Sequence, residues 1–380
     1  MDPVYIVGVG MSRFESEKPA DTFADLVYEA TANALDDAGL TWEDLESVVT
    51  VSNDFMDGRT ISSMPVMHAC GSYGKNVSTV EGDGTFGAIY GMMRVLSGKY
   101  GSTLVVAHSK GSEGSPACIT NGMFDPIYER MLGIDFISSS AMQARVYMDR
   151  FGITEEQCAQ VSVKNLKNAI DNPFALRAKE ISVDEVMRSK MMADPIKELD
   201  ASPITDGSCA IIFASQDFVK KTKTKPVRPL GLGYCADAYF IGDRDLSQSA
   251  SLSKAAQTAY QMAGIKDPLG ELDVAEISET FTYQELMWTE GLGFCEPGKG
   301  AALLEAGTTG MGGKLPVNPS GGLLAANATL VAGLVRIAEI IRQLRGEAGN
   351  HQVDNARLGL AHGVNGVCGQ AHCVWIFGTD

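Results

Sequence analysis

Side chains able to exchange protons or donate hydrogen bonds stand beside glycines at several turns of this sequence. The turn Glu81-Gly82-Asp83-Gly84 places two carboxyl groups directly before an apolar helical stretch at 86–96. His362 ends a strand-like run, and imidazole is the side chain that most readily exchanges a proton near neutral pH. Asn327 follows the glycine pair Gly321-Gly322, and its amide can donate a hydrogen bond to a developing oxyanion. The two carboxyl groups and the imidazole are candidates for acid–base chemistry, and the amide is a candidate for stabilising negative charge.

The cysteines point away from a disulfide framework or a zinc site. The sequence has eight of them, scattered and with no C-x-x-C spacing. We therefore expect reduced thiols in a cytoplasmic protein and no metal in this chain. Cys70 begins a suggestive Cys70-Gly71-Ser72, but it precedes a predicted strand. We expect it to be a small buried thiol in a loop.

Composition and charge exclude several classes of function. Hydrophobic residues make up 45% of the sequence and charged residues 21%, which is ordinary for a globular protein. A net charge of −16 argues against a nucleic-acid partner, because nothing draws a polyphosphate backbone over a broad surface. A small anionic ligand needs only a local basic rim. No apolar run reaches the ~18 residues of a membrane span, and residues 4–10 read as a buried strand rather than a signal peptide.

The elements that must position these residues form a repeated α/β pattern. Short β-branched runs alternate with helical patterns, which is typical of sheets covered by helices. The 380-residue length also exceeds one hydrophobic core. We predict an N-terminal half at 1–110 plus 201–222, a cap-like insertion at 111–200 and a C-terminal half at 223–380. Thr154 is the expected N-cap of a helix inside the insertion.

Several motifs together resemble the thiolase superfamily, in its sterol-carrier-protein or lipid-transfer branch. Asn318-Pro319-Ser320-Gly321-Gly322 resembles the N-x-x-G-G loop of thiolases. The segment 281–295 resembles the helix after the thiolase N-E-A-F motif, and 361–366 resembles the closing loop of that branch. The stretch 163–207 resembles its insertion. The resemblance implies a duplicated thiolase fold, in which two βαβαβ-type halves form a layered α-β-α-β-α core. It also implies a homodimer core and coenzyme A as substrate.

The resemblance also shows that the usual catalytic residues are replaced. Thiolases carry a nucleophilic cysteine in a C-x-S-G turn at a helix start, where the helix dipole lowers the thiol pKa. Here Glu81 takes the cysteine position and Asp83 the serine position. Glu81 is either a general base that activates the thiol of coenzyme A or a helix cap in an inactive site. Asn327 or Ala328, depending on a one-residue gap, replaces the histidine of the G-H-P motif.

Other positions of the resemblance give further candidates. The N-E-A-F position reads Ser278-Glu279-Thr280-Phe281, so the asparagine is lost and Glu279 is the retained acidic candidate. His362 matches a histidine of the branch, and the alternative is a buried structural histidine. The phosphates of coenzyme A need cations near the pocket mouth, although a solvated helix face explains such residues equally well. The candidates, together with the glycine pair, are Lys164, Lys167, Arg177, Lys190, Gly321 and Gly322.

Three functions follow from the resemblance. The first is cleavage or formation of a carbon–carbon bond in a 3-oxoacyl-CoA by thiolytic retro-Claisen chemistry, with an aromatic substrate such as benzoylsuccinyl-CoA as one candidate. This branch often acts with a small zinc-ribbon/OB-fold partner. The second is a retro-aldolase, which Ala328 or Asn327 disfavours because such enzymes carry a tyrosine there. The third is a non-catalytic subunit of a larger complex.

Overall fold

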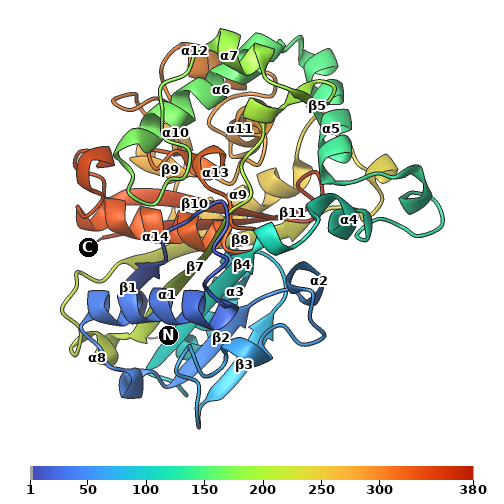
Figure 1. Cartoon of the computed structure of the whole chain (residues 1–380). Coiled ribbons are helices and arrows are strands. Elements are labelled where there is room, and N and C mark those ends of the chain that lie inside the picture. The colour runs from blue at the N-terminus through green and yellow to red at the C-terminus, as the bar shows by residue number, and fades with distance from the viewer. Residues whose placement is uncertain (1–2, 380) are drawn as a thin grey trace.

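A computed structural model describes residues 3–379 of the chain, which form two stacked β-sheets separated and covered by helices (Figure 1). The first sheet belongs to the N-terminal half of the sequence and has the strand order β1-β7-β4-β2-β3. Its strands are β1 (Val4–Met11), β7 (Asp206–Ser215), β4 (Ser102–Lys110), β2 (Ser47–Val51) and β3 (Asn76–Val80). Strands β2, β3 and β4 run parallel, whereas β7 is antiparallel to both β1 and β4.

The second sheet belongs to the C-terminal half and has the order β8-β11-β10-β9. Its strands are β8 (Arg228–Ala236), β11 (Ala371–Gly378), β10 (Leu358–Asn365) and β9 (Val274–Glu276). Strand β9 is parallel to β10, and β11 is antiparallel to its two neighbours. Both sheets are therefore mixed, with antiparallel pairing on one side and parallel pairing on the other.

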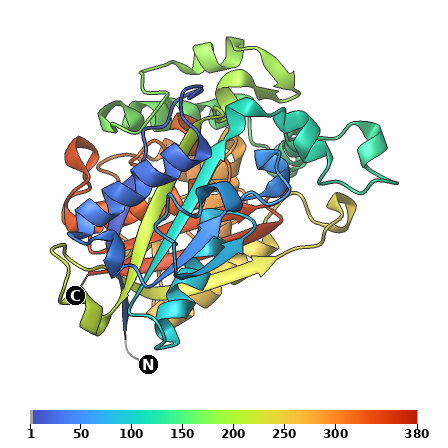
Figure 2. The ribbon, with the colours of Figure 1, turned by 60° about the horizontal axis from the view of Figure 1, so that its bottom comes forward.

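Four long helices complete the layers. Helices α3 (Gly84–Leu96) and α14 (Ala332–Arg345) lie between the two sheets, whereas α1 (Phe23–Ala38) covers the outer face of the first sheet and α9 (Ala250–Ala263) that of the second. Figure 2 shows this stack from a second direction. The central layer is apolar on both sides, because side chains of α3 and α14 pack with those of both sheets in one buried cluster. The expected α-β-α-β-α order is confirmed.

Glycine pairs mark the duplication in the first strand of each half. A Cβ on Gly8 or Gly10 of β1 would lie 2.5 or 2.2 Å from a carbonyl oxygen of α1, and one on Gly231 or Gly233 of β8 would lie 2.1 or 1.9 Å from a carbonyl oxygen of α9. No side chain fits at these distances, so glycine lets each strand approach its helix closely. The two halves thus use the same packing device at corresponding places.

The segment between β4 and β7 rises above the C-terminal half. It holds α4 (Pro116–Asn121), α5 (Phe136–Phe151), α6 (Glu155–Asn168), α7 (Val183–Arg188) and the short pair β5 (Met191–Ala193) and β6 (Ile196–Lys197). Helix α6 packs on α11 (Thr282–Gly291) and α13 (Gly322–Ala325). The remaining helices are α2 (Asp54–Asp57), α8 (Gln216–Val219), α10 (Pro268–Glu271) and α12 (Gly300–Glu305).

Local sequence signals account for the helix starts. Thr154 Oγ1 accepts a hydrogen bond from Gln157 N, and the Thr154 backbone N–H donates one to Gln157 Oε1, so the expected N-cap of α6 is confirmed as a capping box. Cys70 lies in a turn before β3 and is fully buried. Burial raises the pKa of its thiol to about 11, in agreement with an inert packing residue.

Within residues 3–379 no helix is both long and apolar enough to cross a membrane.

Candidate active site

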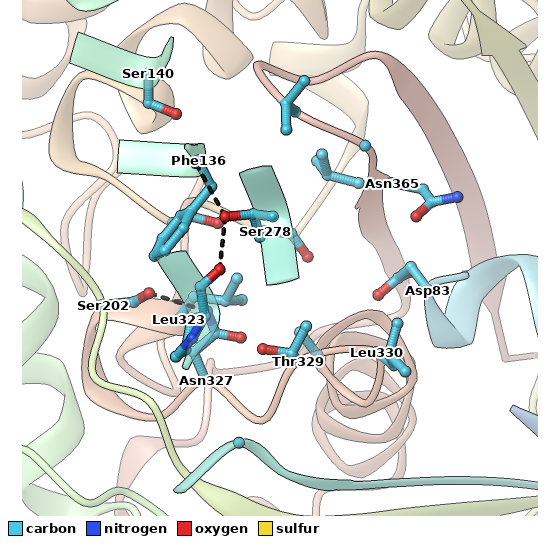
Figure 3. Close-up of a pocket in the computed structure, with 18 of the residues that line it drawn as sticks. Asp83, Phe136, Ser140, Ser202, Ser278, Leu323, Asn327, Thr329, Leu330 and Asn365 are labelled. Atoms are coloured by element: carbon cyan, nitrogen blue, oxygen red, sulfur yellow. Dashed lines mark hydrogen bonds between the residues drawn. The ribbon is translucent and has the colours of Figure 1, made fainter. Parts of the chain in front are cut away.

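A cavity of about 200 Å³ opens where the two halves and the insertion meet. Its walls come from the start of α3, the segment around α4 and α5, residues 278–284 leading into α11, the segment 323–332 after the glycine pair, and residues 364–369 at the end of β10 and the loop after it. Figure 3 shows Asp83, Ser278, Asn327, Thr329 and Asn365 around it. Segments far apart in the sequence therefore contribute polar groups to one concave site, as is usual for ligand pockets.

Asp83 is the N-cap of α3 and the only acidic residue that lines the cavity within the described residues 3–379. One carboxylate oxygen accepts hydrogen bonds from Thr85 N at 3.0 Å and Thr85 Oγ1 at 2.5 Å, and the other accepts one from Gly333 N at 2.8 Å. The side chain is 4% exposed. Burial raises the pKa of this carboxyl above its usual value, although the hydrogen bonds from Thr85 oppose the shift.

The glycine pair has the backbone conformation that its motif requires. Asn318, Gly321 and Gly322 all have positive φ, at 54°, 97° and 65°, a region that glycine enters at little cost. A Cβ on Gly322 would lie 2.0 Å from Glu279 Oε1. Gly321 and Gly322 therefore shape the turn into α13 by their conformation and small size, and neither lines the cavity. Leu323, directly after them, does.

A ring of buried side chains lies behind this turn. The amide nitrogen of Asn165 donates to Glu279 Oε1 at 2.9 Å and to Glu285 Oε2 at 2.8 Å, while that of Asn318 donates to Glu279 Oε2 at 2.8 Å and Glu285 Oε2 at 3.1 Å. Lys164 Nζ lies 3.0 Å from Glu285 Oε1. Burial first, and then the neighbouring Glu285 charge, raise the pKa of Glu279 to about 8. The ring joins α6, the 278–281 loop and the glycine loop.

His362 belongs to a buried chain of hydrogen bonds. Its Nδ1 accepts from Ser278 N at 3.3 Å and its Nε2 lies 2.9 Å from His372 Nδ1, while His372 Nε2 lies 2.9 Å from Ser249 Oγ. The backbone N–H of Ser278 can only donate, so Nδ1 of His362 must be the acceptor. Neutral His362 therefore carries its proton on Nε2 and donates it to His372 Nδ1. His372 in turn donates to Ser249.

Both histidines stay neutral near pH 7 and neither lines the cavity. Burial, followed by the adjacent His372, lowers the pKa of His362 well below its ordinary value, and burial lowers the pKa of His372 to about 3. Every ring nitrogen of the pair has a protein partner. His362 therefore contacts the Ser278 backbone and His372, and neither of its ring nitrogens faces the cavity.

Asn327 is the residue that reaches the cavity at the G-H-P position. Its Nδ2 donates to Ser202 Oγ at 2.9 Å, and the amide nitrogen keeps a second N–H. Ala328 is 2% exposed and packs in the apolar layer between the sheets. Of the two residues, Asn327 lines the cavity and Ala328 does not.

Comparisons with known proteins identify the family of this chain. The thiolase N-terminal domain model matches residues 4–217, and the C-terminal domain-like model matches residues 234–379. The chain belongs to the thiolase superfamily. Acetyl-CoA acetyltransferase of Methanothermobacter thermautotrophicus is 34% identical over 98% of both chains. Sterol carrier protein 2 of Oryctolagus cuniculus is 30% identical over 94% of this chain and 69% of the relative.

One further relative and one solved structure are informative. Benzoylsuccinyl-CoA thiolase subunit BbsB of Thauera aromatica is 32% identical over 63% of each chain. The solved structure of an Ltp2-ChsH2(DUF35) aldolase has a TM-score of 0.85 with 23% identity, covering 100% of this chain and 98% of that one. The expected membership in the sterol-carrier-protein branch is confirmed. The family acts on thioesters of coenzyme A in carbon–carbon bond chemistry.

The structure places Glu81 away from the thiolase cavity. Its side chain is exposed, it hydrogen-bonds to Asn53 Nδ2, and it is not among the lining residues. The physical reason is the conformation of Gly82, whose φ of +125° separates Glu81 from the helix start. Asp83, two residues later, is the carboxyl that faces the cavity. Glu279 also lies behind the wall, in the buried ring.

None of the four expected cations lines the cavity. Lys164 is buried against Glu285, and Arg177 donates to the Ala201 carbonyl at 2.8 Å. Lys167 is exposed and lies 3.6 Å from Glu180, and Lys190 is exposed. The ammonium group of Lys164 therefore compensates the buried carboxylate of Glu285, because a buried carboxylate without a partner is costly.

The sequence missed several cavity residues. Thr329 and Ser202 have no distinctive spacing. Asn365 ends β10 and Cys368 lies in the loop after it, and the pattern drew attention instead to His362, earlier in β10. Cys368 has a φ of +53°, and burial raises the pKa of its thiol. Asn365 gave no sequence signal either. A Cβ on Gly82 would lie 2.9 Å from its Nδ2, but that contact joins residues far apart in sequence and exists only in the folded structure.

Proposed function

We propose that this protein cleaves or forms the carbon–carbon bond of a 3-oxoacyl-CoA by retro-Claisen chemistry without an acyl-cysteine intermediate. One observation carries the proposal: the cavity lies at the start of α3, as in a thiolase site, and Asp83 rather than a thiol stands there. The coenzyme A thiol then attacks the 3-oxo carbon directly. A sulfur–carbon bond forms, the C2–C3 bond breaks, and its electron pair passes to C2. The products are a shorter acyl-CoA and a second acyl-CoA.

Asp83 is the proposed general base. It accepts the proton of the attacking thiol and returns it to C2, so no external acid or base is consumed. Its raised pKa suits both directions of transfer, since a carboxyl of low pKa would hold a proton poorly. The hydrogen bonds from Thr85 and Gly333 fix its orientation.

Asn327 is the proposed donor to the substrate oxygen. Ser202 holds one of its two amide hydrogens, which orients the other in the cavity wall. A fixed donor of this kind stabilises the negative charge that develops on the 3-oxo oxygen. Glu279 and His362 are proposed as positioning residues: Glu279 supports α13, which carries Leu323, and His362 supports the loop that carries Ser278.

The proposal includes a homodimer core and a small zinc-ribbon/OB-fold partner in a cytoplasmic setting. Support for a partner comes from the names of two relatives, one a thiolase subunit and the other an aldolase solved with ChsH2(DUF35). The cavity also has no lining cation within residues 3–379, so the phosphates of coenzyme A must be held outside it, by Lys167, Lys190 or another chain. The eight free thiols suit a reducing compartment.

The test is turnover of 3-oxoacyl-CoA plus coenzyme A by the purified chain, alone and with a candidate partner, with products identified by mass spectrometry. We expect two acyl-CoA products and no acyl adduct on the intact protein. An adduct on a cysteine would overturn the direct mechanism. No turnover of linear or aromatic 3-oxoacyl-CoA in either form would favour the non-catalytic subunit. A retro-aldol role is less well supported, because no tyrosine lines the cavity among the described residues.

A further inference from the structure

The turn between β10 and β11 forms one wall of the cavity and is held from behind by side chains. Val367, Cys368 and Gly369 line the cavity, whereas Arg244 and Gln143 do not. Arg244 Nη1 donates to the carbonyls of Val367 and Cys368 at 3.1 and 3.4 Å. Gln143 Nε2 also donates to the Cys368 carbonyl, at 3.1 Å. Both carbonyl groups of the turn therefore point away from the cavity.

The peptide group between Val367 and Cys368 consequently presents its N–H to the cavity. In a trans peptide the C=O and N–H bonds point in opposite directions, so a carbonyl that faces Arg244 places the Cys368 N–H on the cavity side. No acceptor within residues 3–379 receives this N–H. A buried N–H without an acceptor is costly, so a ligand oxygen placed here would gain a hydrogen bond.

Arg244 places a positive charge behind this N–H. Its Nε and Nη2 are buried without a hydrogen-bond partner, and no carboxylate within residues 3–379 forms an ion pair with it. A guanidinium taken from water without a counter-charge is costly. The charge therefore favours an anion on the cavity side of the turn, where a charge-assisted hydrogen bond is about twice as strong as a neutral one.

Ser140 adds a hydroxyl group to the same corner. It lies on α5, lines the cavity and is almost fully buried, and its oxygen is directed toward the cavity (Figure 3). Burial raises the pKa of the Cys368 thiol, and both Arg244 and Ser140 oppose that shift. The guanidinium and the hydroxyl are therefore close to one residue of the turn, and hence to one another.

We propose that this corner is a carboxylate subsite, in which the Cys368 N–H and the Ser140 hydroxyl donate to a carboxylate and Arg244 balances its charge from behind. The ligand class is a 3-oxoacyl thioester whose acyl group carries a second carboxylate. This inference deepens the proposed function, on which it rests, by assigning residues that select the acyl group. The phosphates of coenzyme A fit less well, because a nucleotide does not enter a cavity of about 200 Å³.

The first test compares thioesters that differ in charge and hardly in shape. Succinyl-, glutaryl- and adipyl-CoA each end in a carboxylate, and the half-amide of each replaces it with a carboxamide. Both members of a pair carry the same coenzyme A, so its phosphates contribute equally. Calorimetric titration into the purified chain should show tighter binding of the carboxylate at one or more chain lengths, by at least about tenfold. Equal affinities at every length, or no binding of any member, would overturn the inference.

The second test assigns the preference to residues. Arg244→Met should reduce it to within about threefold, whereas Arg244→Lys, which keeps the charge, should retain a larger preference. Arg228→Met removes one exposed positive charge elsewhere and should keep the wild-type preference. Ser140→Ala should lower the preference by about threefold or more and serves if Arg244→Met folds poorly. An undiminished preference in Arg244→Met and Ser140→Ala would contradict the subsite.

Binding and turnover separate the two claims. If the carboxylate thioesters bind more tightly but no 3-oxoacyl-CoA is cleaved, the subsite stands and the proposed reaction fails. If 3-oxoadipyl-CoA and its half-amide are cleaved with equal kcat/KM, the reaction stands and the subsite fails. A higher kcat/KM for 3-oxoadipyl-CoA that Arg244→Met abolishes supports both.

Discussion

Replacement of Glu279 by glutamine should change how stability depends on pH. Glu279 accepts hydrogen bonds from Asn165, Asn318 and Leu324 N and is fully buried. Its pKa is raised to about 8 from an ordinary 4.5, so between these values the folded chain holds a proton that the unfolded chain has released. The free energy of unfolding therefore falls as pH rises through this window, by about 1.4 kcal/mol per pH unit.

Glutamine cannot titrate, so Glu279→Gln removes this slope. Its carbonyl oxygen can take the place of Oε1, and its amide nitrogen then faces the donor Asn318. The loss of one buried hydrogen bond costs about 1–3 kcal/mol. We therefore expect the variant to be less stable than the wild type at pH 6.5, and the gap to narrow by about 1.4 kcal/mol at pH 7.5. The two stability curves should converge as pH rises.

The assay is urea denaturation followed by tryptophan fluorescence at several pH values and one protein concentration. Other titrating groups are common to both proteins, so the difference between their unfolding free energies isolates Glu279. The exposed Glu296→Gln controls for removal of a carboxylate as such. Parallel curves for wild type and Glu279→Gln would show that Glu279 holds no proton at neutral pH, and the reasoning from burial would be refuted.

Three further predictions follow from the site. Asp83→Asn should lower turnover of 3-oxoacyl-CoA at least about 100-fold in steady-state assays. Glu81→Gln, at an exposed position, should keep turnover within about threefold of the wild-type rate. The opposite result would identify Glu81 rather than Asp83 as the base. His362→Ala should lower the free energy of unfolding by about 2–4 kcal/mol. It should leave the pH profile of turnover unchanged, because both ring nitrogens of this neutral histidine are hydrogen-bonded within the protein. A shifted pH profile would indicate that His362 transfers a proton. Gly322→Ala should cost at least about 2 kcal/mol in urea denaturation, since its Cβ would lie 2.0 Å from Glu279 Oε1, and a near-neutral result would mean that the glycine loop moves easily.

Most of the fold was predictable from local pattern. The strand expected at 4–10 is β1 (Val4–Met11), and the helical stretch expected at 86–96 belongs to α3 (Gly84–Leu96). These predictions succeeded because hydrophobic periodicity and glycine turns act over short distances. The motif at 318–322 also gave the family, because its positive φ values restrict which residues can stand there.

The roles of charged residues were much less predictable. Lys164 and Lys167 are three residues apart on one helix, yet one is buried against Glu285 and the other is exposed to solvent. Helical spacing alone does not say which face meets a partner. Likewise, Glu81 and Asp83 are two positions apart in the sequence. The conformation of Gly82 between them leaves Asp83, but not Glu81, facing the cavity.

The sequence by itself determined the layered α/β fold and the superfamily, and it led us to propose that the cysteine and histidine of an ordinary thiolase are replaced. These follow from residue types, spacing and local backbone preference. Only the tertiary structure decided which carboxyl lines the cavity, that Asn327 rather than Ala328 enters it, and that His362 faces a backbone amide instead of a substrate. Those outcomes depend on burial and on partners from distant segments, because the pKa and orientation of a side chain are set by its neighbours in space.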